Sequence, residues 1–337
     1  MDRIGVGIIG AGRIANVHAQ SIASNIPEAE LIAISDPIEK AAQTAAKKYG
    51  IPHVYTDYHK ILEDPSIKAV FVCSPTNTHA DIAMEAAKAG KQIFCEKPID
   101  TSVAKILETE KVVKAAGVKM QIGFNRRFDH NFRKIHELRE SGALGDVQIV
   151  KITSRDPEPP SAEYAAKSGG MFLDMTIHDF DMACYQAGSD VDEVFAYGAV
   201  TVDPAIGKAG DIDTAIITLK FKNGALGVID NCRKAVYGYD QRVEVFGSKG
   251  SAAAENDTPT NVKVSTKDSV SSDKPLFFFL ERYMQSFTDE KREFFKAIAN
   301  NTEVPVTIED GLKPIMIAIA AKKSMDEHRP VKMSEIK

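Results

Sequence analysis

Asp174, His178 and Asp181 are spaced i, i+4 and i+7 within the stretch GGMFLDMTIHDFDMA, residues 169–183. On a helix this spacing places the three side chains on one stripe. A carboxylate one turn from an imidazole can orient the ring and stabilise its protonated form. The two glycines that open the stretch permit close approach of a ligand to the backbone. We therefore predict an acid–base pair of Asp174 and His178. A divalent-metal site and a purely structural stripe are the alternatives, and no metal is expected.

Lys97 lies in the stretch CEKPIDTS (95–102), which follows the short apolar run Gln92-Ile93-Phe94. Lysine is rarely buried unless it is paired or has a function. In an open parallel sheet, ligands bind outside the carboxyl ends of the strands. If this run is such a strand, Lys97 points into the ligand crevice and is a candidate catalytic residue.

The first 124 residues alternate between short apolar runs and helical patterns. Near-continuous apolar strands that alternate with helices predict a parallel sheet with helices on both faces. The expected strands are 4–10, 29–36, 68–75, 92–98 and 119–124, and the expected helices are 14–24, 38–50, 79–90 and 102–116.

The pattern Gly10-x-Gly12-x-x-Ala15 lies between the first expected strand and the first expected helix. Glycines here allow a tight turn and close approach of a pyrophosphate, which rests on the helix N-terminus. Asp36 ends the second strand about two dozen residues further on, where an acidic residue binds the adenosine ribose. Its carboxylate would repel a 2′-phosphate, and no arginine follows in SDPIEK, so NAD is favoured over NADP. Arg13 is the one nearby cation that could meet the adenosine phosphate region.

A second polar loop, CSPTNTH (73–79), follows the third strand and faces the same expected crevice. Its alternative interpretation is a structural loop in which Thr78 caps the next helix. Glu96 could contact the cofactor side of the crevice or balance the charge of Lys97. The expected cofactor-binding residues are Gly10, Gly12, Arg13, Ile14, Asp36, Ser74, Thr76, Asn77, His79, Glu96 and Lys97.

The pattern changes near residue 124. A strand at 147–157 is followed by two hairpins, at 213–233 around Asn223-Gly224 and at 239–256 around GSKG. A surface loop is expected at 257–275, and helices at about 280–299 and 309–327, the latter opened by a Thr307–Asp310 capping box. The predicted fold is α/β: a Rossmann dinucleotide-binding domain (1–123), then an α+β domain (124–337) with a mainly antiparallel open-faced sheet. The last helix is expected to pack back on the first domain.

Composition narrows the classes of partner. The net charge is −5 and the pI about 6.0, so nothing favours a nucleic acid. Apolar stretches fall short of a membrane span, and the sequence enters its first strand without a leader pattern. The four cysteines lack CxxC spacing and are typical of reduced thiols in a cytoplasmic protein.

Two further stretches could contact a substrate. GFNRRFD (123–129) carries Asn125, Arg126 and Arg127, which are donors for an oxygen-rich molecule. NCRKAVYGYDQR (231–242) carries Tyr237 and Tyr239 between the two hairpins. Taken singly, each of these side chains is more often structural than functional.

The GxGxxA fingerprint, the CxPTxxH loop, EKP and the GG…D…H…D stretch, in this order, resemble the glucose–fructose oxidoreductase / inositol dehydrogenase (Gfo/Idh/MocA) family over essentially the whole chain. DMTIHDFDMA and YGYDQRVEVFGSKG are similar to bacterial inositol 2-dehydrogenases. The resemblance implies NAD-dependent oxidation of myo-inositol to 2-keto-myo-inositol in inositol catabolism. It also implies a homotetramer in which the open face of the second sheet packs between subunits.

Carried over by motif, the resemblance makes Lys97, Asp174 and His178 the catalytic residues. It implies substrate contacts from Asn125, Arg126 or Arg127, Asp156, Asp174, His178 and Tyr237. Where some relatives have a histidine, this chain has Arg155 and Asp156, which leaves the substrate isomer open. Whether Lys97 or His178 accepts the proton is also open. The alternatives are dehydrogenation of scyllo-inositol, D-chiro-inositol or a sugar, a metal-dependent polyol dehydrogenase, and a non-catalytic NAD-binding regulator.

Overall fold

The computed structural model describes residues 3–336 and divides the chain into two compact units. Unit 1 comprises the chain up to Phe128 together with Met284–Leu312. Unit 2 comprises Asp129–Tyr283 and the chain from Lys313 onward. The cofactor motifs therefore lie in unit 1, and the predicted acid–base pair lies in unit 2.

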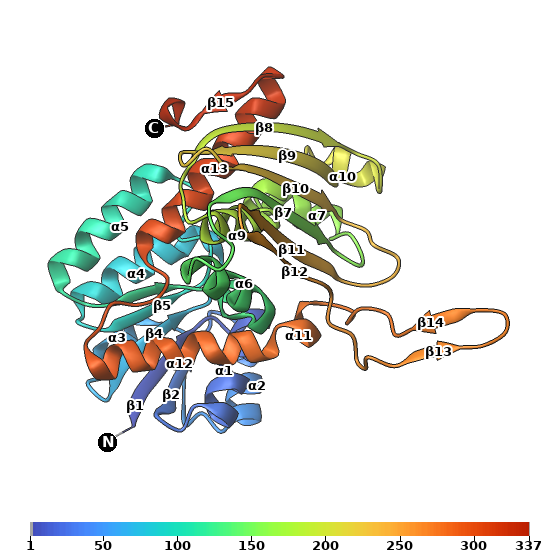
Figure 1. Cartoon of the computed structure of the whole chain (residues 1–337). Coiled ribbons are helices and arrows are strands. Elements are labelled where there is room, and N and C mark those ends of the chain that lie inside the picture. The colour runs from blue at the N-terminus through green and yellow to red at the C-terminus, as the bar shows by residue number, and fades with distance from the viewer. Residues whose placement is uncertain (1–2, 337) are drawn as a thin grey trace. The chain divides into compact units, whose positions relative to one another are not determined.

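Unit 1 is built on a six-stranded parallel sheet with the order β3-β2-β1-β4-β5-β6 (Figure 1). The strands are β1 (Ile4–Ile9), β2 (Ala29–Ser35), β3 (His53–Tyr55), β4 (Ile67–Val72), β5 (Gln92–Cys95) and β6 (Met120–Ile122). The chain order reverses between β1 and β4, and such a switch point is where open α/β sheets bind ligands. The predicted parallel sheet is confirmed.

Helices cover both faces of this sheet. Val6 and Ile8 of β1 pack in one core cluster with residues of α1, α2 and α12. Gly7 faces the other side, where a Cβ would lie 2.3 Å from Cγ2 of Ile61 in α3. The helices of unit 1 are α1 (Arg13–Asn25), α2 (Glu39–Tyr49), α3 (His59–Glu63), α4 (His79–Lys88), α5 (Val103–Ala116) and α12 (Met284–Asn300), with 3₁₀ turns η1 (Thr76–Thr78) and η2 (Asn125–Phe128).

Unit 2 contains a seven-stranded sheet with the order β12-β11-β7-β10-β9-β8-β15 (Figure 1). Its strands are β7 (Val147–Arg155), β8 (Val191–Ala199), β9 (Thr214–Phe221), β10 (Leu226–Cys232), β11 (Asp240–Gly247), β12 (Gly250–Ala254) and β15 (Val331–Lys332). All neighbours are antiparallel except β7 and β10, which run parallel. Both predicted hairpins are present, as β9–β10 and β11–β12. The mainly antiparallel second sheet is therefore confirmed.

The remaining helices are α6 (His130–Glu140), α7 (Ala162–Lys167), α8 (Met171–Asp174), α9 (Ile177–Ala187), α10 (Pro204–Lys208), α11 (Phe279–Arg282), α13 (Ile308–Glu327) and the 3₁₀ turn η3 (Met333–Glu335). The capping box at α13 is present, since the Asp310 carboxylate accepts from the Thr307 N–H and the Thr307 hydroxyl accepts from the Asp310 N–H. The segment predicted as a plain loop instead contains a small hairpin, β13 (Lys263–Ser265) with β14 (Val270–Ser272), drawn in orange in Figure 1. Within residues 3–336, no helix is long and apolar enough to cross a membrane.

Candidate active site

The glycine-rich turn joins β1 to α1 in unit 1. Gly10 has φ +103°, and a Cβ there would lie 2.6 Å from the carbonyl oxygen of Cys73, so only glycine fits. Gly12 is the N-cap residue of α1, and a Cβ there would meet no described protein atom within 4 Å. Packing within the chain therefore does not require the second glycine. Close approach of a pyrophosphate to the helix N-terminus does account for it.

Asp36 follows β2 and is held against this turn. One carboxylate oxygen accepts a hydrogen bond from the Ala11 N–H at 2.8 Å, and the other accepts from the Ile38 N–H at 2.8 Å. Carboxylate oxygens have further lone pairs, so both can still accept from ribose hydroxyls. The glycine turn and Asp36 thus form a donor and acceptor set that fits the pyrophosphate and adenosine ribose of a dinucleotide.

His79 connects two loops at the carboxyl edge of the sheet. Its Nε2 lies 2.7 Å from the carbonyl oxygen of Ser74, and its Nδ1 lies 2.8 Å from the carbonyl oxygen of Pro98. Both ring nitrogens of this buried residue therefore contact backbone oxygens. The geometry fits a residue that positions the loops better than a direct cofactor ligand. Thr76 and Asn77 lie on the 3₁₀ turn that this contact anchors.

Lys97 and Glu96 follow β5 at the same edge. The Lys97–Pro98 peptide bond is cis, and Lys97 is half-buried. Glu96 is buried, and its Oε1 lies 2.5 Å from Nε2 of His18 in α1. Lys97 lies in the bend that follows β5, one residue after this buried pair. The burial of this carboxylate and its interaction with the charge of Lys97 favour the second role considered for Glu96, balance of that charge, over contact with the cofactor.

The stretch GFNRRFD (123–129) spans the end of the first segment of unit 1, which closes at Phe128. Asn125 is buried and donates to the Ser286 hydroxyl at 3.3 Å. Arg127 donates to Asp310 at 3.0 Å, and Arg126 is 6% exposed. Either arginine is still a candidate for the polyol contact.

The predicted single helix through Asp174 and His178 is wrong. Asp174 is the last residue of α8, and His178 lies in the first turn of α9, with Met175 and Thr176 between the two helices. The Thr176 hydroxyl donates to the Asn231 side chain in β10 at 2.6 Å. This contact with a strand distant in sequence ties the break to the sheet, which helical periodicity alone does not reveal.

Arg233 is the residue that the sequence interpretation missed. Its side chain is buried directly after β10, and Nη2 lies 3.0 Å from Oδ2 of Asp174. Nη1 lies 3.3 Å from Oδ2 of Asp156, so one guanidinium joins two predicted substrate-binding carboxylates. The Tyr164 hydroxyl donates to the other oxygen of Asp174 at 2.9 Å. The sequence carried one signal that could have identified Arg233: it follows a strand whose alternate residues are buried.

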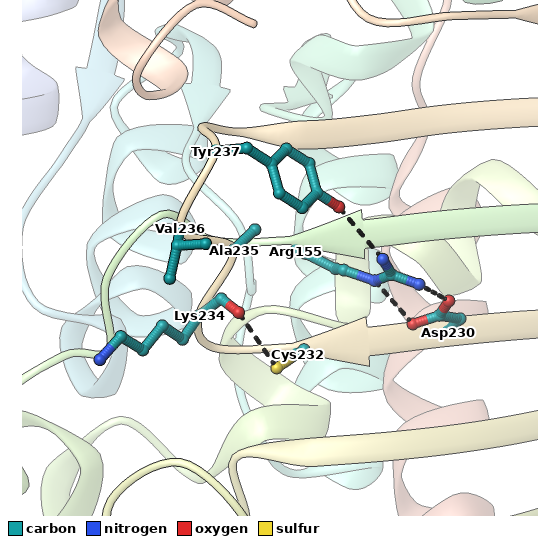
Figure 2. A pocket seen from close by; sticks show the side chains of 7 residues that line it. All are labelled: Arg155, Asp230, Cys232, Lys234, Ala235, Val236 and Tyr237. Carbon is teal, nitrogen blue, oxygen red and sulfur yellow. Dashed lines mark hydrogen bonds and ion pairs between the residues drawn. The ribbon is translucent and has the colours of Figure 1, made fainter. Parts of the chain in front are cut away.

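Tyr237 lies beside a pocket of about 360 Å³ in unit 2, drawn in Figure 2. Arg155 donates to the Tyr237 hydroxyl at 3.1 Å and to Asp230 at 3.0 Å. The Tyr237 hydroxyl in turn donates to Asp240 at 2.5 Å. Burial and this bond to Asp240 raise the pKa of Tyr237, so its phenol stays protonated as a donor. The residues that line the pocket are Arg155, Asp230, Cys232, Lys234, Ala235, Val236 and Tyr237.

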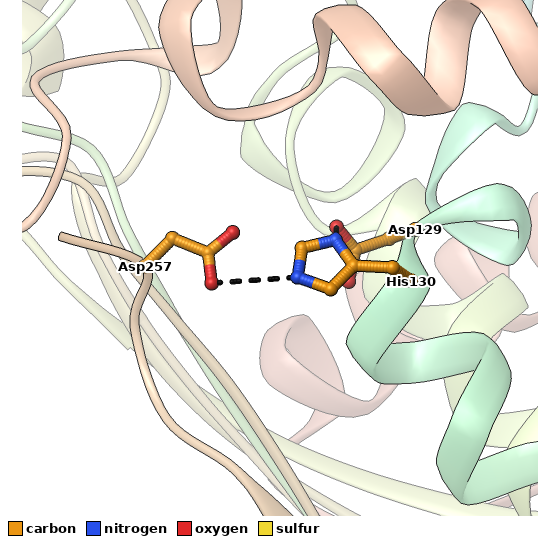
Figure 3. Close-up of side chains that lie close together, drawn as sticks. All are labelled: Asp129, His130 and Asp257. Carbon is orange, nitrogen blue, oxygen red and sulfur yellow. Dashed lines mark ion pairs between the residues drawn. The ribbon is translucent and has the colours of Figure 1, made fainter. Parts of the chain in front are cut away.

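One group of described residues has a spacing that could hold a metal ion: Asp129, His130 and Asp257 in unit 2 (Figure 3). Arg282 pairs with both carboxylates of this group, and its guanidinium lies 2.8 Å from Asp257. The positive charge that two carboxylates attract is therefore already supplied by the protein. We therefore interpret the group as an ion-pair cluster that stabilises the fold around the start of α6, and not as a metal site.

The parallel sheet, the glycine turn and the Asp36 carboxylate held beside it are typical of a dinucleotide-binding domain. Residues 4–124 match the oxidoreductase family with an NAD-binding Rossmann fold, and residues 132–253 match the GFO/IDH/MocA C-terminal domain. The chain belongs to the Gfo/Idh/MocA family, which confirms the resemblance inferred from its motifs.

Relatives match along nearly the whole chain. This chain is 53% identical to an uncharacterized oxidoreductase, YrbE, of Bacillus subtilis over 98% of this chain and 96% of that protein. It is 48% identical to a myo-inositol 2-dehydrogenase of Thermotoga maritima over 98% of this chain and 99% of that protein. Among solved structures, scyllo-inositol dehydrogenase from Lactobacillus casei with bound NAD(H) and scyllo-inositol is 31% identical, with a TM-score of 0.92, covering 99% of this chain and 100% of that one.

Proposed function

We propose that this protein is an NAD-dependent inositol 2-dehydrogenase that oxidises myo-inositol to 2-keto-myo-inositol in inositol catabolism. The observation that carries the proposal is the full-length similarity, at 48% identity, to a myo-inositol 2-dehydrogenase. The retained Lys97, Asp174 and His178 favour catalysis over a regulator that only binds NAD.

The proposed residue roles follow from the chemistry of alcohol oxidation. Bound NAD supplies the hydride acceptor, and the protein orients and polarises the substrate. Lys97 donates a hydrogen bond to the reacting oxygen and stabilises its developing negative charge. His178 accepts the hydroxyl proton as the carbon–hydrogen bond breaks. Arg233 holds the carboxylates of Asp156 and Asp174 so that they can accept hydrogen bonds from neighbouring hydroxyls.

A panel of polyols and cofactors tests the function. We expect NADH formation with myo-inositol to have the highest kcat/KM, and activity with NADP to be much lower because Asp36 repels a 2′-phosphate. A preference for scyllo-inositol is the second candidate, favoured by the similarity to the Lactobacillus casei enzyme. Absence of NADH formation with every cyclic polyol and sugar would overturn the proposal. Full activity after exhaustive chelation is expected, since no residue role involves a metal.

We further propose that the protein is a homotetramer formed through the open face of the unit 2 sheet, which is the face that carries the exposed apolar side chains named next. Alternate positions on five strands expose large apolar side chains on this face: Ile149, Tyr197, Ile216, Leu226 and Phe246. Leu226 pairs with Ile149, and Ile149 pairs with Phe246, so three of them are neighbours. Apolar surface concentrated on one face is typical of a protein interface.

Leu226→Glu should break this assembly, because a carboxylate replaces an apolar side chain that is 55% exposed in the single chain. Light scattering after size-exclusion chromatography should show a tetramer for the wild type and smaller species for the variant. Leu107→Glu on α5, where the leucine is 41% exposed, is the matched control and should remain tetrameric. A monomeric wild type at micromolar concentration would refute the assembly.

We also propose that the protein acts in the cytoplasm. NAD is an intracellular cofactor, and within residues 3–336 the cysteines Cys73, Cys95, Cys184 and Cys232 form no disulfide. The proposed partner is a small cyclic polyol, with no role for nucleic acid or a membrane.

A further inference from the structure

We propose that Glu96 is a positioning residue for Lys97, and that His18 holds its carboxylate in place at the end of β5, with the buried Lys291 as a further nearby charge. This inference rests on the proposed function in one respect, namely that Lys97 contacts the reacting oxygen. All four residues belong to unit 1.

The Glu96 carboxylate is enclosed by parts of the chain that are far apart in sequence. His18 in α1 is fully buried, and its Nε2 lies 2.5 Å from Oε1 of Glu96. Lys291 in α12 is also fully buried, and its ammonium donates to the carbonyl oxygen of Phe287 and lies 3.4 Å from Glu290. The His18 ring thus contacts a carboxylate that is only 7% exposed, and Lys291 interacts with that carboxylate through its charge.

The surroundings leave the carboxylate little freedom to move. A Cβ at Gly123 would lie 3.1 Å from the carboxylate carbon of Glu96, so the backbone beside β6 comes as close as glycine permits. The His18 ring is packed among three aromatic rings, with its centroid 5.0 Å from Phe94, 5.5 Å from Phe71 and 6.1 Å from Phe287. The donor that holds Glu96 is therefore itself fixed by packing.

The charges of the cluster are consistent with an ionised Glu96 and a neutral His18. Burial raises the pKa of Glu96, but the hydrogen bond from His18 and the nearby positive charge of Lys97 bring it below its ordinary value. Burial and then Lys291 lower the pKa of His18 to about 4, so at neutral pH the ring donates from Nε2.

Groups on the other elements face the same carboxylate. Burial raises the pKa of Glu290 to about 8, which leaves that side chain largely protonated at neutral pH. Burial lowers the pKa of Lys291, against the attraction of Glu290 and Glu96. Cys73 and Cys95 are kept as thiols by burial and by the Glu96 charge.

Two consequences for Lys97 follow. The chain direction at residues 96–98 is fixed because the side chain immediately before Lys97 is clamped. The negative charge of Glu96 also favours the ammonium form of Lys97, since attraction between neighbouring charges acts on both partners. Lys97 is thereby kept as a hydrogen-bond donor at the ligand edge of the sheet.

The test compares Glu96→Gln, His18→Leu and His18→Gln, the last of which keeps an N–H donor. We expect His18→Leu and Glu96→Gln to reduce kcat at least about tenfold with KM for NAD nearly unchanged, and His18→Gln to recover part of the loss. In the protein without substrate, pH-dependent acetylation of Lys97, followed by mass spectrometry, should show its midpoint lowered by about one pH unit in Glu96→Gln.

Ser21→Ala is the matched control, because Ser21 is a buried residue of the same helix whose hydroxyl contacts Thr288 of α12 at 2.9 Å. It should leave kcat and the Lys97 midpoint unchanged. The inference is overturned if Glu96→Gln and His18→Leu lose stability but keep the wild-type kcat and the wild-type Lys97 midpoint, as is expected of this control. Absence of turnover in the wild type would count against the proposed function alone, since the acetylation measurement needs no turnover.

A measurement on the unaltered protein covers the case in which these variants do not fold. Nitrogen NMR of the histidine side chains should show one ring, His18, neutral and protonated on Nε2 throughout the neutral pH range. A His18 that titrates near its ordinary value of about 6.5 would overturn the clamp.

Discussion

Lys97→Met should lower kcat by about 10²- to 10³-fold while the dissociation constant for NAD changes little. Removal of one hydrogen-bond donor from a developing oxyanion costs about that much in enzymes where it has been tested. The loss appears in kcat because the bond strengthens as charge develops on the substrate oxygen. Steady-state kinetics with myo-inositol give kcat, and calorimetric titration with NAD gives the dissociation constant.

Lys91→Met is the control for this variant. Lys91 lies next to the opposite end of the same strand, and its ammonium donates to the backbone carbonyls of Asp64 and Ile67 at 2.6 and 2.8 Å. This substitution should cost stability and leave kcat near the wild-type value. A Lys97→Met enzyme with turnover within a few-fold of wild type would rule out Lys97 as a catalytic residue.

His178→Asn should lower kcat/KM by about 10²- to 10⁴-fold, the range that a positioned general base contributes. The pH dependence carries the sharper information. A base must be unprotonated to act, so wild-type activity should fall as the pH is lowered through its pKa. If His178 is that base, the acidic limb should disappear from the residual activity of the variant.

His130→Asn provides the comparison, since His130 is an exposed histidine of the same unit. It should behave as wild type, which also tests the interpretation of the Asp129, His130 and Asp257 group as structural and not as a metal site. An acidic limb that persists unchanged in His178→Asn but vanishes in Lys97→Met would assign the proton acceptor to Lys97 instead.

The sequence predicted those features that depend on neighbours along the chain. The parallel sheet followed from apolar runs that alternate with helical patterns, and the β9–β10 hairpin followed from Asn223-Gly224. The position of Asp36 beside the glycine turn could be predicted, because the end of β2 and the turn before α1 lie at the same edge of the sheet. The structure adds that the Ala11 N–H holds this carboxylate.

Features that depend on contacts distant in sequence could not be predicted. The break between α8 and α9 is tied down by Asn231, and Arg233 reaches Asp174 across 59 positions. His18 and Glu96 are 78 positions apart, and each taken alone is an ordinary residue near a motif. Periodicity specifies which face of an element is buried, but not which polar side chains meet there.

Deuterium transfer tests the central claim, direct hydride transfer from inositol to NAD, most directly. The wild-type enzyme is incubated with NAD and myo-inositol deuterated at the carbon that bears the oxidised hydroxyl, and both products are analysed by NMR. Direct transfer predicts one deuterium at C4 of the nicotinamide ring for each 2-keto-myo-inositol formed, with none released to water. Deuterium appearing in the solvent, or NADH formed without deuterium, would contradict it.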